Sequence, residues 1–526
     1  MAVPAAKRGG DALPGPVRLR QLAAAAPGGI LTGDAWVWDV AYDSRRVRPG
    51  SLFFAIAGAH SDGHDFAPAA VAAGASALVV ERRLPLPVPQ LLVPSVREVV
   101  GPVSGAYYGN PSRRMRVVGV TGTNGKTTVC SVLRQSLDAA GAPAGQIGTV
   151  GSLFQGRSLP ADLTTPQAAD LQWTLWQMVR SGVGAVAMEA SSHGLDQHRL
   201  DGISFDVGIF TNLSREHLDY HGSMERYLEA KTALFEPGRC GEAVVGVDDE
   251  WGRKLLGRIQ IPVVTFGRHA GADVRLEVRE HGLEGIAVTL AGIDGGVELT
   301  SRLVGAVNGP NVAAAYLAAR RLGVQVDDAV RGIAQAAPPP GRFQLVDAGQ
   351  PFLVVVDYAH TPDALGALIG TARRLATGRV TVVLGARGNR DRGKRTLMGR
   401  NASEADRVVL TADSPGDEPV GDIIQALYRG VLEGPCEASV FVDPDRRRAI
   451  DLAIATSEPG DVVLIIGRGH EQVQHFGDRA VFLDDRVVAR EALARAFGSP
   501  AGEGPDTAGE PSGAGAGVRT AGAGCD

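Results

Sequence analysis

A run of glycine, lysine and threonine residues has the composition and spacing of a loop that binds phosphate. The sequence GVTGTNGKTT at positions 119–128 lies between an apolar run and a segment with helical periodicity. Glycines let backbone N–H groups converge on phosphate oxygens, and the start of a helix adds partial positive charge. We expect Lys126 to reach the β- and γ-phosphates of a nucleotide and Thr127 to place its hydroxyl on Mg²⁺.

This loop is a variant of the usual P-loop pattern. Val120 stands where the strict pattern has glycine, so Gly122 and Gly125 are the expected flexible points. A glycine-rich turn with a solvated lysine is the alternative interpretation. The chain has five lysines against a large excess of arginines, so a lysine kept at position 126 favours the phosphate interpretation.

A phosphate-binding loop needs a second ligand set for Mg²⁺, and three later residues are candidates. Glu189 ends the apolar run AVAME, where a carboxylate at the end of a neighbouring strand can reach the metal. His217 and His221 follow on one loop, but two loop histidines are often ordinary surface or core residues, and no third soft ligand supports zinc. Lys231 lies on a helix predicted from about position 223, where a solvated lysine is the usual interpretation.

The elements that must position these residues alternate between strands and helices, which is typical of an α/β fold. The patterns predict strands at 116–120, 185–189, 207–211 and 243–247, and a helix at 127–140. Four further apolar runs, at 352–356, 380–384, 407–410 and 462–466, each end in a polar loop. Because ligands bind beyond the carboxyl ends of parallel strands, we expect these four loops to line one edge of one domain.

Length and composition predict the number of domains and exclude some kinds of partner. A chain of 526 residues exceeds one ordinary core, and we expect domains at 16–112, 113–337 and 338–498, with a disordered Gly/Ala-rich tail at 499–526. The net charge of −5 argues against a nucleic-acid partner. No apolar run approaches the ~20 residues that span a bilayer, and no secretion signal is present, so we expect a cytoplasmic enzyme without membrane insertion, and a monomer.

Six blocks of sequence, taken together, resemble the Mur ligases: TGTNGKTT, MEASSHGLDQHRL, FTNLSREHLDYHGSMERYLEAKTALF, VDYAHTPDAL, GNRDRGKR and GRGHE. Within that family they are most similar to the UDP-N-acetylmuramoyl-tripeptide synthetase (MurE) type. The resemblance implies an N-terminal UDP-binding α/β domain, a central P-loop ATPase domain and a C-terminal Rossmann-like domain. It further implies that ATP phosphorylates the carboxylate of UDP-N-acetylmuramoyl-L-alanyl-D-glutamate and that the amine of a third amino acid displaces the phosphate, as in peptidoglycan precursor synthesis.

The resemblance also assigns site residues. Positions matching the ATP site are Gly122, Thr123, Asn124, Gly125, Lys126, Thr127, Thr128, Asn308, Arg342, Asp357 and His360. Positions matching the UDP-muramoyl peptide site are Ser44, Thr164, Thr165, Ser191, Gln197 and Arg199. Positions expected to bind the amino acid are Arg387, Arg390, Asp413, Ser414, Pro415, Gly416, Gly467 and Glu471. The Mg²⁺ positions are Thr127, Glu189, His217 and Lys231, the last as N6-carboxylysine, and these four together with Lys126 are the expected catalytic machinery.

The carbamate on Lys231 has an electrostatic reason, because an ammonium beside Mg²⁺ is repelled whereas a carbamate supplies an anionic oxygen. For Asn308 and Arg342, hydrogen bonding at a domain interface is an alternative interpretation.

The expected amino-acid pocket departs from the family pattern. Members of the family that add diaminopimelate carry Asp-Asn-Pro-Arg in the loop that binds the distal carboxylate of the amino acid. This chain has DSPG at 413–416 and so lacks the arginine. Arg387 and Asn389 replace glycine and aspartate in the neighbouring loop, which raises the local positive charge. Either the third residue is selected differently, diaminopimelate being less favoured than in a standard member, or the chain is a paralogue acting on a related peptide. A folylpolyglutamate synthase, a non-catalytic nucleotide-binding scaffold and a nucleotide switch are the rival classes.

Overall fold

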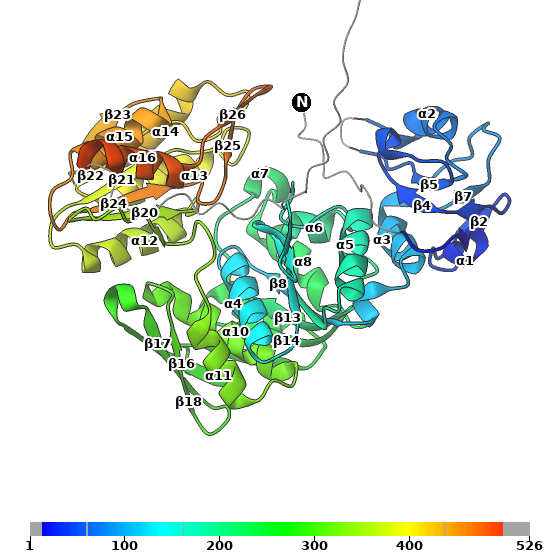
Figure 1. Ribbon diagram of the computed structural model, residues 1–526, viewed down its shortest axis with the longest axis horizontal. Coiled ribbons are helices and arrows are strands. Elements are labelled where there is room, and N and C mark those ends of the chain that lie inside the picture. Colours follow the sequence, from blue (N-terminus) through cyan, green and yellow to red (C-terminus); the bar gives the residue numbers. More distant parts are fainter. Residues whose placement is uncertain (1–12, 59–60, 161, 436, 498–526) are drawn as a thin grey trace, which may run out of the picture.

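The computed structural model describes residues 13–58, 61–160, 162–435 and 437–497, so the tail expected at 499–526 lies outside the described residues. Figure 1 shows the N-terminal part at the right, the C-terminal part at the left and the central part between and below them. Within the described ranges each part is built around its own sheet. No helix in these ranges combines the length and the apolar character needed to cross a membrane.

The N-terminal part has a sheet in the order β2-β7-β6-β5-β4 and a separate β1–β3 pair. Its strands are β1 (Val17–Arg18), β2 (Ile30–Leu31), β3 (Trp36–Val37), β4 (Asp39–Ala41), β5 (Ser51–Phe54), β6 (Ala77–Val80) and β7 (Gln90–Leu92). Its helices are α1 (Leu19–Ala23), α2 (Ala67–Ala72), α3 (Val96–Tyr107) and the short η1 (Ser44–Arg46), η2 (Gly63–Phe66) and η3 (Pro111–Arg113). Helix α3 packs on α5 (Ala168–Arg180) of the central part, where the Tyr108 and Trp176 rings lie 5.7 Å apart.

The central sheet runs β11-β10-β9-β12-β8-β13-β14-β15-β16-β17-β18 and is parallel from β9 to β16. Its strands are β8 (Arg116–Thr121), β9 (Ala144–Gly148), β10 (Gly151–Phe154), β11 (Arg157–Leu159), β12 (Ala185–Glu189), β13 (Phe205–Phe210), β14 (Cys240–Gly246), β15 (Val263–Gly267), β16 (Val274–Glu280), β17 (Ile286–Ala291) and β18 (Val297–Ser301). The other helices are α4 (Lys126–Ala139), α6 (Ser192–Asp196), α7 (Leu218–His221), α8 (Met224–Thr232), α9 (Glu250–Leu256), α10 (Gly309–Arg321), α11 (Val326–Gln335), η4 (Ala233–Phe235), η5 (Gly282–Glu284) and η6 (Ala306–Asn308).

The predictions for this part are confirmed in type. The strand at 185–189 has the expected bounds, and the strands at 116–120, 207–211 and 243–247 are present with ends shifted by a few residues. The helix predicted at 127–140 is α4. The helix predicted from about 223 is α8, whose N-cap Ser223 accepts a hydrogen bond from the backbone N–H of Arg226.

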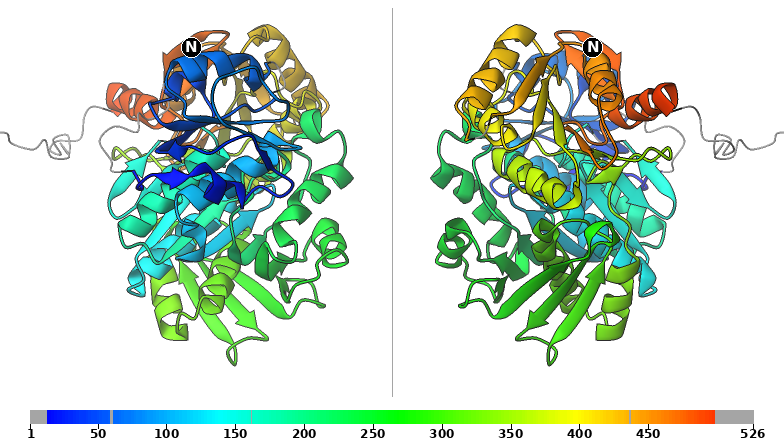
Figure 2. Two further views of the ribbon diagram at one scale, coloured as in Figure 1. Left: turned by 90° about the vertical axis from the view of Figure 1, so that its right-hand side faces the viewer. Right: turned by 90° about the vertical axis from the view of Figure 1, so that its left-hand side faces the viewer.

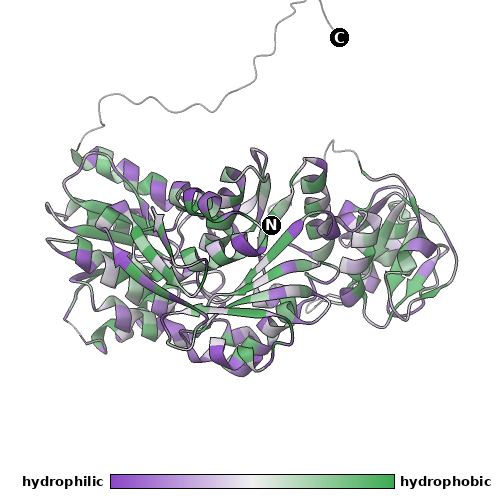
Figure 3. Cartoon of the chain, turned by 90° about the horizontal axis from the view of Figure 1, so that it is seen from below, coloured by the Kyte–Doolittle hydropathy of each residue, from purple (hydrophilic) through white to green (hydrophobic). Residues whose placement is uncertain are grey.

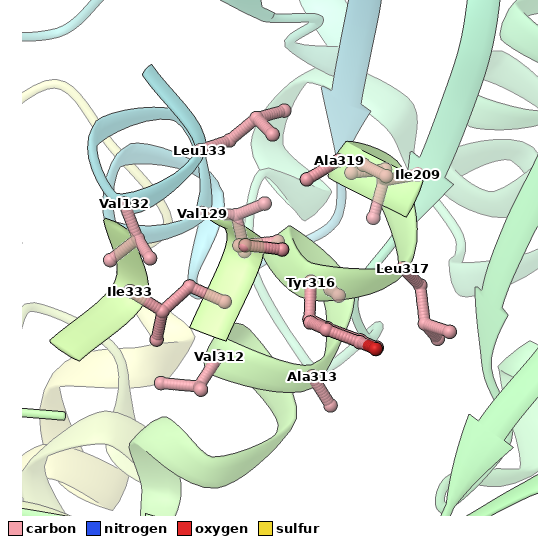
Figure 4. Close-up of a cluster of buried hydrophobic side chains, with 14 of the residues drawn as sticks. Val129, Val132, Leu133, Ile209, Val312, Ala313, Tyr316, Leu317, Ala319 and Ile333 are labelled. Atoms are coloured by element: carbon pink, nitrogen blue, oxygen red, sulfur yellow. The ribbon is translucent and has the colours of Figure 1, made fainter. Parts of the chain in front are cut away.

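Helix α4 is held in place by an apolar interface with α10 and α11. Val129, Val132 and Leu133 are fully buried on the face of α4 that meets these helices. Val312 and Ile333 from α10 and α11 lie against them, as Figure 4 shows. Burying side chains of this size stabilises the fold by roughly 1.5–3 kcal/mol each. The interface therefore fixes the N-terminus of α4, where the glycine-rich loop ends.

The C-terminal sheet runs β19-β20-β24-β21-β22-β23, and β20, β24, β21 and β22 are mutually parallel neighbours. Its strands are β19 (Gln344–Leu345), β20 (Leu353–Asp357), β21 (Val380–Leu384), β22 (Arg407–Leu410), β23 (Ser439–Val442) and β24 (Val462–Ile466), and β25 (Val473–Phe476) pairs with β26 (Arg479–Phe482). Its helices are α12 (Pro362–Leu375), α13 (Gly393–Ala402), α14 (Val420–Leu432), α15 (Arg446–Ala455) and α16 (Asp485–Phe497).

The predicted arrangement of four loops along one edge of the C-terminal sheet is confirmed. The strands at 380–384, 407–410 and 462–466 have the expected bounds, and β20 is shifted by one residue from 352–356. All four point the same way, so the loops that follow them leave from the same edge. Figure 2 shows helices on both faces of this sheet, and Figure 3 shows the hydrophobic residues concentrated in the strands.

The C-terminal part contacts the central part through a buried ion pair. Lys394 Nζ lies 2.9 Å from Glu216 Oε1, and the two side chains are only 6% and 7% exposed. Burial raises the pKa of Glu216, and Lys394 opposes that shift without overcoming it. The carboxylate therefore depends on its lysine whenever the two parts are in contact.

Removal of that lysine should open the molecule. We expect Lys394→Met to shift the chain toward separated domains, because a stranded buried charge costs about 3–5 kcal/mol and hydration on opening relieves it. Small-angle X-ray scattering should then give a larger radius of gyration. The double variant Glu216→Gln/Lys394→Met should return toward the unsubstituted value, and Lys254→Met at the exposed pair with Glu250 should change nothing. An unchanged radius for Lys394→Met would contradict this role of the ion pair.

Candidate active site

The glycine-rich loop runs from the end of β8 to the start of α4. Gly125 has φ +89°, and a Cβ there would lie 2.2 Å from Asn311 Oδ1. A Cβ on Gly122 would lie 1.9 Å from Thr211 Oγ1, so the loop passes too close to its neighbours for a larger residue at either position. Lys126 Nζ donates hydrogen bonds of 2.9 Å to the carbonyls of Gly122 and Thr123. Backbone and lysine thus form a curled cradle at a helix N-terminus.

Lys126 is only partly exposed, and its electrostatic surroundings are mixed. Burial lowers its pKa, Glu189 raises it and Arg342 lowers it again. The ammonium is currently held by two neutral carbonyls of its own loop. A polyanionic ligand in the cradle would offer it a stronger, charge-assisted partner.

Glu189 lies beside the loop in a pocket of neutral donors. Its carboxylate is 1% exposed and accepts hydrogen bonds from Thr127 Oγ1 at 3.0 Å, and from the Thr149 backbone N–H at 2.9 Å. The Thr149 hydroxyl also donates to it at 3.1 Å. Arg342 Nη2 reaches across from the C-terminal part and donates to Thr127 Oγ1 at 3.1 Å. A hydroxyl and a buried carboxylate 3.0 Å apart beside a phosphate cradle are the oxygen ligands that Mg²⁺ prefers.

Lys231 is buried next to the same loop without a carboxylate partner among the described residues. Its Nζ donates to the Gly122 carbonyl at 2.9 Å and lies 3.5 Å from Thr121 Oγ1 and 4.5 Å from the centre of the Tyr227 ring. Burial, and secondarily the charge of Lys126, hold its pKa well below the ordinary value. A larger share of the amine is therefore neutral than in a solvated lysine, and only the neutral amine can combine with CO₂.

His217, the remaining expected Mg²⁺ residue, packs 6.2 Å from the Tyr227 ring, which also contacts Lys231. Its pKa is lowered first by burial and then by His193, whose ring centre is 4.6 Å away, with smaller contributions from Lys231 and Lys126. The imidazole is therefore neutral at physiological pH, which is the form that ligates metals. In the described part of the chain no cluster of three or more His, Cys, Asp or Glu side chains is set to hold a metal, so a cation at Glu189 and His217 would need Thr127 and a modified Lys231 as well.

A cavity of about 580 Å³ opens next to the cradle, between the central and C-terminal parts. Seven of the residues expected at the nucleotide line it: Asn124, Gly125, Thr128, Asn308, Arg342, Asp357 and His360. Phe266, Leu303 and Val304 give it apolar walls, and Asp248 lies among the polar groups. The rest of the glycine-rich loop lies next to the cavity without lining it: Gly122, Thr123, Lys126 and Thr127. The shape suits a nucleotide with its phosphates on the loop and its base in the cavity.

The C-terminal wall of this cavity is rigidly held. Asp357 accepts hydrogen bonds of 2.6 Å from the backbone N–H groups of Phe343 and Ala359. Burial raises its pKa, and Arg342 together with those bonds opposes the shift. The Arg342 guanidinium stacks 4.5 Å from the centre of the Tyr358 ring. Burial holds the pKa of His360 well below its ordinary value, and its Nδ1 lies 2.9 Å from the Tyr358 carbonyl.

The residues expected at the UDP-muramoyl peptide form a connected group behind Glu189. Thr165 Oγ1 donates to the Glu189 carbonyl at 2.7 Å and lies 3.0 Å from Ser191 Oγ. Arg199 donates to the Thr165 carbonyl at 3.0 Å and to Gln197 Oε1 at 2.5 Å. Thr164 Oγ1 accepts from Thr149 Oγ1 at 3.4 Å. Ser44 comes from the N-terminal part instead, where it begins η1.

The residues expected at the amino acid come from three of the four loops on the C-terminal sheet edge. Arg387 and Arg390 follow β21, the segment 413–416 follows β22, and Gly467 and Glu471 follow β24. The Gly388 backbone N–H donates to the Ser414 carbonyl at 3.0 Å, so the first two loops touch. Arg390 is exposed, and burial, His221 and the charge of Arg390 lower the pKa of His193 in the central part.

Sequence reasoning missed two groups that organise the site. Thr149 holds both oxygens of Glu189, and His470 Nε2 lies 3.1 Å from the Thr149 carbonyl, linking the C-terminal part to the central one. Tyr358, between two expected residues, is the stacking surface for Arg342. The contact between Thr149 and Glu189 could not be predicted from the sequence around Thr149. It depends on β9 being the neighbour of β12 in the sheet.

A glycine-rich loop at a helix N-terminus, facing the loops of a second parallel sheet, is the arrangement expected of an ATP-dependent ligase. Three family models agree: Mur ligase family, catalytic domain, at residues 39–105; Mur ligase middle domain at 120–319; and Mur ligase, glutamate ligase domain, at 341–469. The chain belongs to the Mur ligase family, and it is an ATP-dependent amide ligase with the three-domain α/β fold of that family.

Several individual proteins and one solved structure within this family are similar to the chain over most of its length. The UDP-N-acetylmuramoyl-L-alanyl-D-glutamate--2,6-diaminopimelate ligase of Geobacillus thermodenitrificans is 43% identical over 459 residues, covering 86% of this chain and 94% of the relative. The ligase of the same name from Streptomyces coelicolor is 39% identical over 489 residues, covering 91% and 96%. A solved structure of a ligase of that name is 31% identical, with a TM-score of 0.63 over 88% of this chain and 95% of the other.

Proposed function

We propose that this chain joins 2,6-diaminopimelate to UDP-N-acetylmuramoyl-L-alanyl-D-glutamate at the expense of ATP, in peptidoglycan precursor synthesis. The observation that carries the proposal is the 43% identity, over 94% of its length, to a relative with that activity in its name. The DSPG segment at 413–416 suggested a weaker preference for diaminopimelate, and the relatives argue against that expectation. A paralogue acting on a related peptide is the competing proposal.

The chemistry begins at the cradle. The peptide carboxylate is a poor electrophile, so one of its oxygens attacks the γ-phosphorus of ATP and ADP leaves, giving an acyl phosphate. In this proposal Lys126 stabilises the negative charge that develops on the phosphate oxygens, and its contact with the Gly122 carbonyl and the Arg342 contact with Thr127 support that role. The amine of the incoming residue then attacks the acyl carbon, phosphate leaves, and the nitrogen loses its proton to form the amide.

Mg²⁺ fits the group formed by Thr127, Glu189, His217 and Lys231. Glu189 is buried with only neutral donors around it, and His217 is neutral, so both are ready to ligate a cation. Lys231 fits only as the carbamate, whose formation its lowered pKa favours. When bound, Mg²⁺ supplies charge neutralisation between the phosphate groups and the attacking carboxylate.

The peptide substrate is expected along Thr164, Thr165, Ser191, Gln197 and Arg199, with the nucleotide end toward Ser44. Thr165 connects Ser191 and Arg199 to the Glu189 backbone carbonyl, and Gln197 and Arg199 line a small pocket together with Tyr42 of the N-terminal part. In this proposal the carboxylate to be phosphorylated arrives at the expected Mg²⁺ residues, and the amino acid approaches from the loops at the edge of the C-terminal sheet.

Phosphate release with the UDP-muramoyl dipeptide and a panel of amino acids tests the proposal. We expect release to require the dipeptide and to be fastest with a diaminopimelate isomer, compared with lysine, ornithine and neutral residues. ATP hydrolysis without any peptide would indicate a nucleotide switch, and binding without turnover a scaffold. Preference for a different peptide would favour the paralogue.

A further inference from the structure

The turn between β9 and β10 supplies two hydrogen bonds to the Glu189 carboxylate. The two strands are antiparallel with Gly148 opposite Gly151, so Thr149 is one of the two residues in the turn. Its backbone N–H donates to Glu189 Oε1 at 2.9 Å, and its hydroxyl donates to Oε2 at 3.1 Å. One residue therefore holds both carboxylate oxygens, which fixes the plane of the carboxylate as well as its position.

The turn lies this close to Glu189 because a glycine precedes it. A Cβ on Gly148 would lie 2.2 Å from Glu189 Oε1. The side chain of Glu189 is buried, and its other hydrogen bond comes from the Thr127 hydroxyl at 3.0 Å. Thr127 is itself an expected Mg²⁺ ligand, so Thr149 is the partner that can orient the carboxylate without binding the ion. Ligating carboxylates depend on such outer partners for their orientation.

The carbonyl of the same turn residue is bound by the C-terminal part. His470 Nε2 lies 3.1 Å from the Thr149 carbonyl oxygen. A carbonyl only accepts hydrogen bonds, so Nε2 carries the proton in this contact. His470 Nδ1 is buried and has no hydrogen-bond partner among the described residues. Burial, and then the charge of Arg342, lower the pKa of His470 to about 4, so the neutral ring gives its single N–H to Thr149.

The position of His470 is fixed by the start of the C-terminal part. Gly341 has φ +67°, and a Cβ there would lie 2.2 Å from the backbone nitrogen of His470. The next residue, Arg342, donates to Thr127 Oγ1 at 3.1 Å. The C-terminal part therefore contacts each of the two threonines that hydrogen-bond Glu189.

We propose that Thr149 is a positioning residue for the Mg²⁺-binding carboxylate of Glu189, and that His470 makes this positioning depend on contact with the C-terminal part. This inference rests on the proposed function, which places Mg²⁺ at Glu189. While the two parts are in contact, His470 holds the turn and Thr149 orients the carboxylate. When they separate, the turn loses that hydrogen bond and the carboxylate is held less firmly. Cation binding and domain contact are thereby linked, so each favours the other.

The affinity for Mn²⁺, used in place of Mg²⁺ and measured by electron paramagnetic resonance with saturating ADP, tests the role of Thr149 without turnover. Thr149→Val removes the hydroxyl and keeps the backbone N–H and the branched shape. It should raise the dissociation constant of Mn²⁺ by about tenfold to a hundredfold, the usual cost of losing a partner of a metal ligand. Thr149→Ser keeps the hydroxyl and should restore most of the affinity.

The same measurement tests His470. His470→Phe should raise the dissociation constant of Mn²⁺ by about twofold to tenfold, the effect of one lost hydrogen bond. His470→Gln keeps an N–H donor at a similar distance along the side chain and should lie closer to the unsubstituted chain. In small-angle X-ray scattering with ADP, Mn²⁺ should reduce the radius of gyration of the unsubstituted chain more than that of His470→Phe. Equal responses of the two chains overturn the role of His470.

Thr265→Val is the matched control, because the backbone N–H and hydroxyl of Thr265 both donate to Asp273, at 2.9 and 2.7 Å. It should leave the Mn²⁺ affinity unchanged. Circular dichroism and ADP binding establish that each variant is folded. An unchanged Mn²⁺ affinity in folded Thr149→Val overturns the inference if Glu189→Gln weakens binding. If Glu189→Gln also has no effect, it is the proposed Mg²⁺ site that fails, so the two failures are distinguishable.

Discussion

Replacement of Lys126 by alanine is expected to reduce ligation by about 10³-fold in kcat, the upper range for loss of one group that stabilises a developing oxyanion. The Lys126 ammonium lies at the start of α4, held only by the carbonyls of Gly122 and Thr123. When a nucleotide occupies the cradle, those neutral contacts are exchanged for charge-assisted ones to phosphate oxygens. The other described lysines near the loop are engaged elsewhere, because Lys231 is fully buried with its Nζ on Gly122 and Lys394 is paired with Glu216.

Phosphate release measured with saturating substrates checks this expectation. Lys254→Ala is the matched control, since Lys254 lies on the surface of α9 in an ion pair of 3.2 Å with Glu250. The control should retain full activity. Helix α4 is anchored by Val129, Val132 and Leu133, so the Lys126 variant should remain folded. Near-normal turnover in folded Lys126→Ala would refute the assignment of the loop to ATP.

Replacement of Lys231 by alanine is the second large effect, with an expected loss of at least about 100-fold, because the proposed role of Lys231 is that of a metal ligand and not merely a supporting contact. The buried amine has no carboxylate partner among the described residues, and burial beside Lys126 lowers its pKa. As an ammonium it would repel Mg²⁺, whereas as a carbamate it would add an anionic oxygen to the proposed Mg²⁺ ligands.

The modification itself can be observed and replaced. In ¹³C-bicarbonate, the unsubstituted chain should show a carbamate carbon signal that is absent from Lys231→Ala. Acetate or formate should restore part of the activity of the variant, because a small carboxylate can occupy the space left by the side chain. Lys231→Arg should not be rescued, since the guanidinium fills that space with a positive charge. If bicarbonate gives no signal and carboxylates no rescue, Lys231 acts as an unmodified amine.

Many of the strands and the glycine-rich loop could be predicted from local sequence patterns. The runs at 380–384, 407–410 and 462–466 are strands with the predicted bounds because β-branched residues bounded by polar loops leave few alternatives. The glycine positions 122 and 125 and the start of α4 were likewise predictable, since loop and helix termini depend on neighbours a few residues away. The domain limits and the roles of the site residues stay predictions.

Only the tertiary structure decided which side chains meet. Thr127 Oγ1 contacts Glu189, 62 positions along the chain, and Arg342, 215 positions along it. Arg387 meets Glu471 across 84 positions because β21 and β24 are neighbours in the sheet although other strands separate them in sequence. The sequence by itself determined the local conformation, since backbone propensity acts over a turn or a strand. The pairing of charges depended on sheet order and domain contact, which are set by burial over the whole molecule.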